Sequence, residues 1–232
     1  LAMDILSDII RNSVLSEEEV DRERHVILQE IGMVHDTPDD LVFDNYQETA
    51  YPGQTLGAPI LGTANIISAM QRPALMDYVK NFYTPPQLIV SAAGNLKHDD
   101  MVLLAEKYFG SLKPNGAIEK PSAIYQGGEH RTEKDLEQSH IVLGFQGVSR
   151  RDADYYAAIA LSTLLGGGMA SRLFQEIREN RGLVYSIFSF HQAYSDEGQF
   201  AIYAGTGPND LPELIPVLCD EILKITGDIT EA

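Results

Sequence analysis

The sequence has little cysteine and little positive charge, and both shortages exclude classes of protein. Cys219 is the only cysteine among 232 residues, so the chain can form no internal disulfide and no site made of several thiolates. Lys and Arg number 17 against 34 Asp and Glu, which gives a formal charge of −17. A chain this acidic is repelled by phosphate backbones and by anionic lipid headgroups, so we expect no nucleic-acid and no membrane partner. Basic peptides or metal cations are better candidates.

Long hydrophobic runs are also missing. No stretch approaches the ~20 apolar residues that a membrane-spanning helix requires. Apolar residues nevertheless make up 44% of the chain, which is enough to build a hydrophobic core. Residues 1–6 already have apolar side chains at helical spacing, with no initiator Met and no signal-peptide pattern, so we expect an excerpt of a longer protein.

Hydrophobic periodicity predicts a helical first half with one buried strand. Ser16 and Glu19 form a capping box at the start of the longest helix. The expected helices span 1–13, 16–35, 40–50, 64–83 and 99–109, and the expected strand spans 88–94.

A segment rich in Pro, Gly and polar residues at 113–134 then breaks the pattern, as linkers do. After it, alternating apolar residues predict strands at 139–147, 183–194 and 199–205, and helical patterns occur at 152–165, at 170–180 and from 210 onward. This order is typical of an α+β fold with helices grouped on one face of a mostly antiparallel sheet. We therefore predict a first, incomplete α+β domain at 1–113, a linker at 114–134, and a second α+β domain at 135–232 that is truncated at its end.

The helix at 16–35 has two glutamates within an apolar arc. Glu23 and Glu30 lie seven residues apart, two helical turns, and so share one face. An unpaired carboxylate on a buried face is costly, so each glutamate needs a partner. The sequence leaves two explanations open: an ion pair with an Arg of a neighbouring element, or a metal ligand supported by a second carboxylate. The apolar arc consists of Val20, Val26, Ile27, Ile31, Met33 and Val34.

Other chemical motifs are incomplete. No two of the six histidines stand four residues apart, and neither H-E-x-x-H nor H-x-x-E-H occurs, so the chain contains no complete zinc site. The triple glycine at 166–168 lacks the Gly-Lys-Ser/Thr of a phosphate loop and suits a helix end and turn instead. No G-x-S-x-G occurs, so a serine nucleophile has no support.

Several ordered motifs resemble the pitrilysin/insulinase-type zinc metallopeptidases, the inverzincins, and within them the mitochondrial-processing-peptidase-like bacterial branch. In the first half they are ERHVILQEI at 23–31, DTPDD at 36–40 and LGAPILGT at 56–63. In the second half they are LLGGGM at 164–169, SRLF at 171–174, RENRGLVY at 178–185 and DEG at 196–198. The resemblance covers nearly the whole chain and implies two related α+β domains.

The resemblance also implies roles for particular residues. In that family an H-x-x-E-H helix supplies two His ligands and a Glu base, and a Glu on a later helix completes the zinc site. Glu30 matches this distal zinc ligand, and Glu23 matches the carboxylate that supports the site. Arg178 and Tyr185 match an Arg and a Tyr of the second domain that reach the scissile bond. Their alternative explanations are a surface ion-paired Arg and a core tyrosine on a strand.

We therefore expect a zinc-dependent metalloendopeptidase in the full-length parent protein, hydrolysing peptides that its two domains enclose. This chain, which lacks the H-x-x-E-H helix, is expected to be inactive alone. The alternative is a non-catalytic partner or structural subunit of the same fold. The expected partners are a basic or extended peptide substrate and, as a homodimer or heterodimer, a second subunit. The bacterial cytoplasm and the periplasm are both compatible with the sequence.

Overall fold

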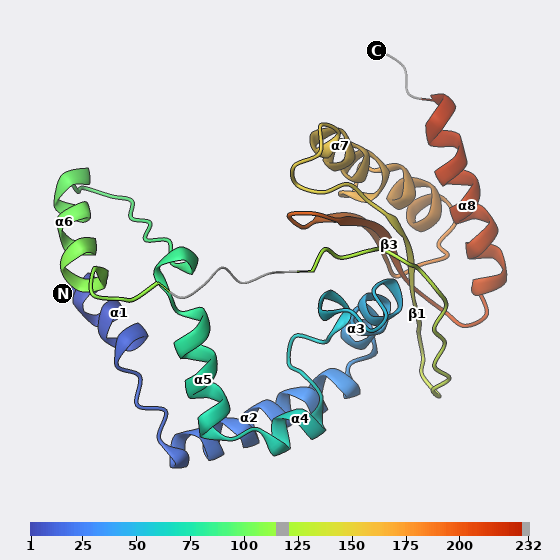
Figure 1. Ribbon diagram of the computed structural model, residues 1–232. Coiled ribbons are helices and arrows are strands. Elements are labelled where there is room, and N and C mark those ends of the chain that lie inside the picture. Colours follow the sequence, from blue (N-terminus) through green and yellow to red (C-terminus); the bar gives the residue numbers. More distant parts are fainter. Residues whose placement is uncertain (115–120, 229–232) are drawn as a thin grey trace. The chain divides into compact units, whose positions relative to one another are not determined.

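The computed structural model describes residues 1–114 and 121–228, and its contacts divide the chain into two compact units (Figure 1). Unit 1 consists of Leu1–Ile31 and Thr63–Lys120, and unit 2 consists of Gly32–Gly62 and Pro121–Ala232. No helix among the described residues is long and apolar enough to cross a membrane.

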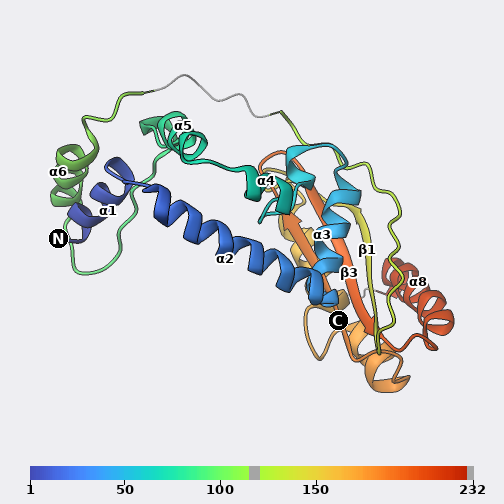
Figure 2. The same ribbon diagram turned by 90° about the horizontal axis from the view of Figure 1, so that it is seen from below.

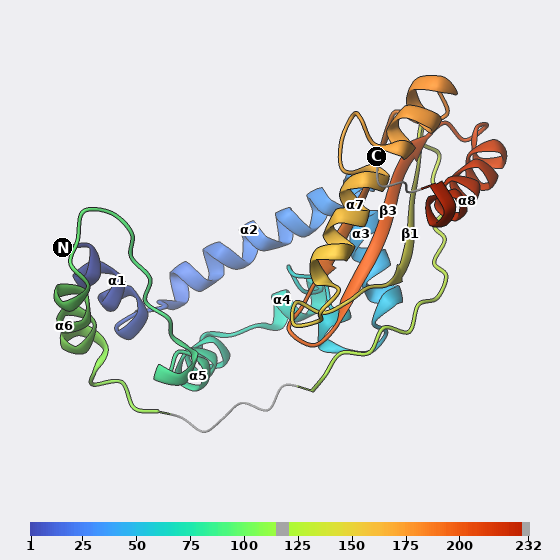
Figure 3. The ribbon, with the colours of Figure 1, turned by 90° about the horizontal axis from the view of Figure 1, so that it is seen from above.

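Unit 1 consists of helices. They are α1 (Ala2–Arg11), most of α2 (Glu17–Asp36), α4 (Ala64–Ala69), α5 (Arg72–Phe82), the short η2 (Pro85–Gln87) and α6 (His98–Phe109). The amide of Glu19 donates to Ser16 Oγ at 3.4 Å, as the capping box predicts. Helices α1 and α6 lie side by side, and Arg11 joins them by donating to the Tyr108 carbonyl at 2.8 Å (Figures 2 and 3).

Two sequence predictions for unit 1 are corrected. The helix expected at 64–83 is two helices, because Pro73 lacks an N–H and its ring would clash with a continuous helix, so Pro73 lies in the first turn of α5 instead. The prediction of a strand at 88–94 is wrong, because these residues form neither a helix nor a strand, and Ile89 is 93% exposed. A strand needs a neighbour to complete its hydrogen bonds, and the described part of unit 1 contains no other strand.

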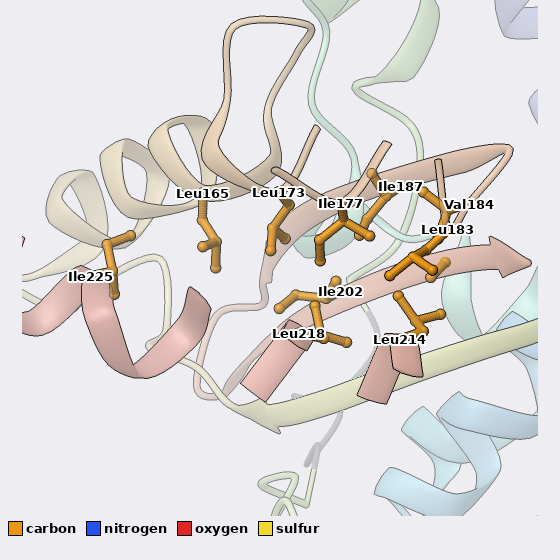
Figure 4. Packing of buried hydrophobic residues seen from close by; sticks show 11 residues of the cluster. Leu165, Leu173, Ile177, Leu183, Val184, Ile187, Ile202, Leu214, Leu218 and Ile225 are labelled. Atoms are coloured by element: carbon orange, nitrogen blue, oxygen red, sulfur yellow. The ribbon is translucent and has the colours of Figure 1, made fainter. Parts of the chain in front are cut away.

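Unit 2 contains an antiparallel sheet, which confirms the α+β prediction. Its strands are β1 (Ser139–Gln146), β2 (Ser186–Ala193) and β3 (Gly198–Thr206), in the order β1-β3-β2. One face is covered by α7 (Tyr155–Gly166), the π-helix η3 (Phe174–Asn180) and α8 (Leu211–Asp228). Figure 4 shows the core they enclose, which is formed mainly by Leu165, Leu173, Ile177, Leu183, Val184, Ile187, Ile202, Leu214, Leu218 and Ile225. Full burial of one such side chain contributes about 1.5–3 kcal/mol.

The opposite face of the sheet is covered by α3 (Pro38–Ala50), followed by the short η1 (Thr55–Gly57). Phe43 of α3 stacks on Tyr203 of β3 with ring centroids 5.3 Å apart, and on Phe188 of β2 at 6.3 Å. Aromatic pairs at these separations add to the stability that burial provides. The contact explains why residues 32–62 belong to unit 2, although they precede the predicted linker.

The described part of the linker, residues 121–134, has no helix or strand, whereas 115–120 lie outside the described residues. Four consecutive backbone amides, those of 123–126, donate in turn to Asp196 Oδ2, Gln54 Oε1, Glu197 Oε2 and the Ala50 carbonyl. This segment is therefore bound to unit 2 and is not a free connection. The prediction of two related domains at 1–113 and 135–232 is not tested by these contacts and stays a prediction.

Candidate active site

The π-helix η3 holds Arg178 at the surface of unit 2. Leu173 and Ile177 are fully buried and fix this helix against the core. Phe174 follows Leu173 in the sequence, and Arg178 follows Ile177. These two residues therefore form a half-buried stripe beside the buried one. A π-helix is rare and is often found at functional sites.

Three groups contact the Arg178 guanidinium. Its Nε donates to the Tyr185 carbonyl at 3.1 Å, and its Nη1 donates to Glu179 Oε1 at 3.2 Å. Its Cζ lies 4.6 Å from the centroid of the Phe174 ring, a cation–π distance. Among the described residues Nη2 has no hydrogen-bonding partner, so this nitrogen can donate to another molecule.

The backbone around Tyr185 is fixed by hydrogen bonds. Gly182 has a φ of +66°, which allows the chain to turn back after η3. The Thr206 hydroxyl donates to the Leu183 carbonyl at 2.6 Å, and the Tyr185 amide donates to the Gly205 carbonyl at 2.8 Å. The Tyr185 side chain is 63% exposed, so it is not the core tyrosine of the alternative explanation.

The structure therefore brings Arg178 and Tyr185 together through a direct contact. Arg178 and Glu179 form an exposed ion pair, which fits the alternative explanation of Arg178 as a surface ion-paired arginine. An exposed pair of this kind contributes about 0–1 kcal/mol, too little to explain the position of the guanidinium. Sequence reasoning missed Phe174, although its spacing of four residues from Arg178 on a predicted helix was a usable signal.

Glu23 and Glu30 are both exposed, in contrast to the apolar environment that the sequence predicts. The covered stripe of α2 is rotated relative to the predicted arc, and it consists of Val20, Arg24, Ile27, Leu28, Ile31 and Val34. Arg24, not Glu23, packs within unit 1, where its Nη2 donates to the Met70 carbonyl at 2.6 Å. The exposed side of α2 therefore contains both glutamates, and the predicted cost of burying them does not arise among the described residues.

The described residues do not fit a complete zinc site. Glutamate oxygens are suitable zinc ligands, but a protein site needs three or four ligands in tetrahedral arrangement. No group of three or more His, Cys, Asp or Glu in the described ranges could hold a metal ion. The role of Glu30 as a ligand stays a prediction.

The α+β fold and the ordered motifs resemble those of zinc metallopeptidases, and comparison with family models defines the family. Residues 1–64 match the family model described as Insulinase (Peptidase family M16), and residues 69–232 match the Peptidase M16 inactive domain. The chain belongs to the insulinase family of peptidases, family M16.

Known relatives agree with this assignment. The chain is 41% identical over 231 residues to an uncharacterized zinc protease of Rickettsia felis, a match that covers 99% of this chain and 56% of the relative. It is 37% identical to the uncharacterized zinc protease YmxG of Bacillus subtilis, with 98% and 56% covered. The fold is similar to the crystal structure of a peptidase M16 inactive domain from Pseudomonas fluorescens, with a TM-score of 0.89 at 21% identity, covering 99% of this chain and 57% of that one. The chain thus spans about half the length of the curated relatives it matches.

Proposed function

We propose that this chain is part of a zinc-dependent endopeptidase in which Arg178 and Tyr185 donate hydrogen bonds to the scissile carbonyl group. The observation that carries the proposal is the fixed Arg178 guanidinium, which leaves Nη2 without a partner among the described residues, next to a tyrosine that is exposed. Family membership and relatives named zinc proteases support the reaction class.

The proposed contribution to catalysis follows from the two hydrogen-bond donors, the Arg178 guanidinium and the Tyr185 hydroxyl. Hydrolysis of a peptide bond places negative charge on the carbonyl oxygen in the transition state. A guanidinium N–H and a phenol O–H held in advance stabilise that charge without reorganising, and one such donor contributes about 10²–10³ in rate. The contacts of Nε and Nη1, together with the Phe174 ring, hold the guanidinium in advance, so less entropy is lost when it orders against the substrate.

On the metal side, the proposal assigns Glu30 as a zinc ligand and Glu23 as the carboxylate that supports the site. Both are exposed, so their carboxylate oxygens are available to a metal. The proposal takes the other ligands from outside this chain, since no group of three or more His, Cys, Asp or Glu among the described residues could hold a metal ion. The formal charge of −17 favours a basic peptide as substrate.

The second candidate is a non-catalytic subunit of the same fold. The observation that favours it is the match of residues 69–232 to a domain model described as inactive. In that case Arg178 and Tyr185 serve only to stabilise unit 2, and their replacement changes stability but no reaction.

The deciding experiment is Tyr185→Phe in the full-length parent protein, with Tyr156→Phe as the matched control, because Tyr156 is also an exposed tyrosine of unit 2. We expect Tyr185→Phe to lower kcat and kcat/KM by similar factors with zinc content unchanged, as expected for a contact made in the transition state. Full kcat of Tyr185→Phe on a fluorogenic peptide, equal to that of the control, would remove Tyr185 from the site.

A parallel pair tests the metal side. Glu30→Gln is expected to lower zinc occupancy and activity together, whereas Glu23→Gln weakens zinc affinity by about 10–100-fold. Glu18→Gln, on the same helix, is the control and should change neither. If Glu30→Gln retains full zinc by metal analysis, Glu30 is not a ligand.

A further inference from the structure

The Phe174 ring lies against the Arg178 guanidinium and takes no part in the proposed hydrogen bonds to the substrate. We propose that Phe174 is a positioning residue that holds the plane of the guanidinium and so aims its free Nη2. This inference rests on the proposed function of Arg178 and adds a second residue to the same site.

The local fold brings the ring and the cation together. Leu173 and Ile177 are buried and fix the rotation of η3 about its axis. A π-helix is wider than an α-helix, so side chains four residues apart lie nearly in line along it. Phe174 and Arg178 have this spacing, and Cζ lies 4.6 Å from the ring centroid.

The other two contacts do not fix the guanidinium plane. The bond from Nε to the Tyr185 carbonyl holds one edge of the group but allows rotation about that bond. Glu179 is the next residue and half exposed, so its ion pair with Arg178 is a weak orienting contact. The ring face supplies the missing constraint, because a planar guanidinium stacks on an aromatic face.

The attraction depends on the aromatic character of Phe174. The face of an aromatic ring is electrically negative and attracts a cation, whereas an aliphatic side chain of similar size fills the space without this attraction. Phe174→Leu should therefore preserve packing and lose the orientation of the guanidinium. Phe174→Tyr keeps the ring face and should preserve both.

The test compares Phe174→Leu with Phe174→Tyr in the full-length parent protein on a fluorogenic peptide. We expect Phe174→Leu to lower kcat/KM by about two- to thirtyfold, the range that a cation–π contact accounts for. Phe174→Tyr should restore activity to near wild type, with zinc content and unfolding temperature unchanged in both. If Phe174→Leu lowers the unfolding temperature, Phe174→Met serves the same comparison.

A double-mutant cycle separates positioning from general destabilisation. In an Arg178→Ala background, Phe174→Leu should cause no further loss, because there is no guanidinium left to aim. An equal loss in both backgrounds, or full activity of Phe174→Leu where Arg178→Ala is impaired, overturns the positioning role alone. Full activity of both Arg178→Ala and Tyr185→Phe overturns the proposed function, and the positioning role with it.

Discussion

The triple glycine at the end of α7 allows a sharp prediction about packing. A methyl group added at Gly166 would lie 2.8 Å from Ser189 Oγ and 3.0 Å from the Phe188 carbonyl carbon, and closer still to the Ser189 nitrogen. Two of these three atoms belong to the β2 backbone, which cannot rotate away as a side chain can. At Gly168, by contrast, an added methyl group meets nothing within 4 Å. Gly166→Ala and Gly168→Ala therefore form a matched pair within one motif.

The expected change in stability follows from the difference in free space around the two glycines. Gly166→Ala has to push α7 from the sheet, and overpacking of this kind costs about 1–3 kcal/mol. Leu165, fully buried beside it, would lose part of its packing as α7 moves. Gly168→Ala has open space and restricts the unfolded chain, so we expect it to be neutral or to stabilise by up to about 1 kcal/mol. Each 1 kcal/mol corresponds to about 2–4 °C in a domain of 150–250 residues, so the two variants should differ by about 2 °C or more.

The assay is thermal unfolding of the full-length protein, followed by circular dichroism, with urea denaturation to obtain the free energy of unfolding. We expect the unfolding temperature of Gly166→Ala to fall and that of Gly168→Ala to stay or rise. Equal unfolding temperatures, or a larger loss for Gly168→Ala, would refute the view that α7 contacts β2 at Gly166. Flexibility of the loop would then be the better explanation of the three glycines.

Two further predictions concern the interior of unit 2. Thr206→Val should lower the free energy of unfolding by about 1–3 kcal/mol in urea, because the buried Leu183 carbonyl loses its donor, whereas Thr206→Ser keeps the hydroxyl and should cost less. Burial raises the pKa of Tyr46 and of Tyr51 above the ordinary value near 10, so the unfolded chain releases these protons first and stability falls as pH rises above ~10. Urea denaturation between pH 9 and pH 11 should show this decline, and Tyr46→Phe should reduce its slope; a slope unchanged in Tyr46→Phe contradicts the assignment.

Local sequence signals were sufficient for most elements of the fold. The capping box at Ser16 and the apolar pattern of the three strands depend on neighbours in sequence, and the structure shows the Ser16 hydrogen bond of the capping box and all three strands. The segment at 88–94 has the apolar composition of a strand, but a strand also needs a neighbouring strand. Such a neighbour comes from a distant part of the sequence, so a local pattern does not reveal it. The position of α3 on the sheet of unit 2 could not be predicted for the same reason, since the Phe43 contacts join residues far apart in the chain.

The candidate site was predictable in its residues and not in its contacts. The spacing of Arg178 and Tyr185 identified the pair through family resemblance, but the bond between them uses the Tyr185 backbone carbonyl, which no residue pattern specifies. On α2, an ideal periodicity centred the apolar arc on Glu23 and Glu30. The covered stripe is instead centred nearer Arg24, because the aliphatic stem of an arginine can cover apolar surface while its guanidinium binds a carbonyl.

This chain contains the contacts that hold the proposed donors, Arg178 and Tyr185, but its described residues do not contain a complete ligand set for the proposed metal ligand, Glu30. Every group that holds Arg178 and Tyr185 lies in unit 2, so replacements there report on the donors without disturbing a metal ligand. Glu30 lies in unit 1, and no group of three or more His, Cys, Asp or Glu among the described residues could hold a metal ion, so its proposed role requires ligands from outside the described residues. Kinetic changes at Tyr185 with constant zinc content, together with zinc loss at Glu30, would therefore establish two independent contributions to one reaction. A change at only one of the two residues would show which contribution the family resemblance assigns correctly.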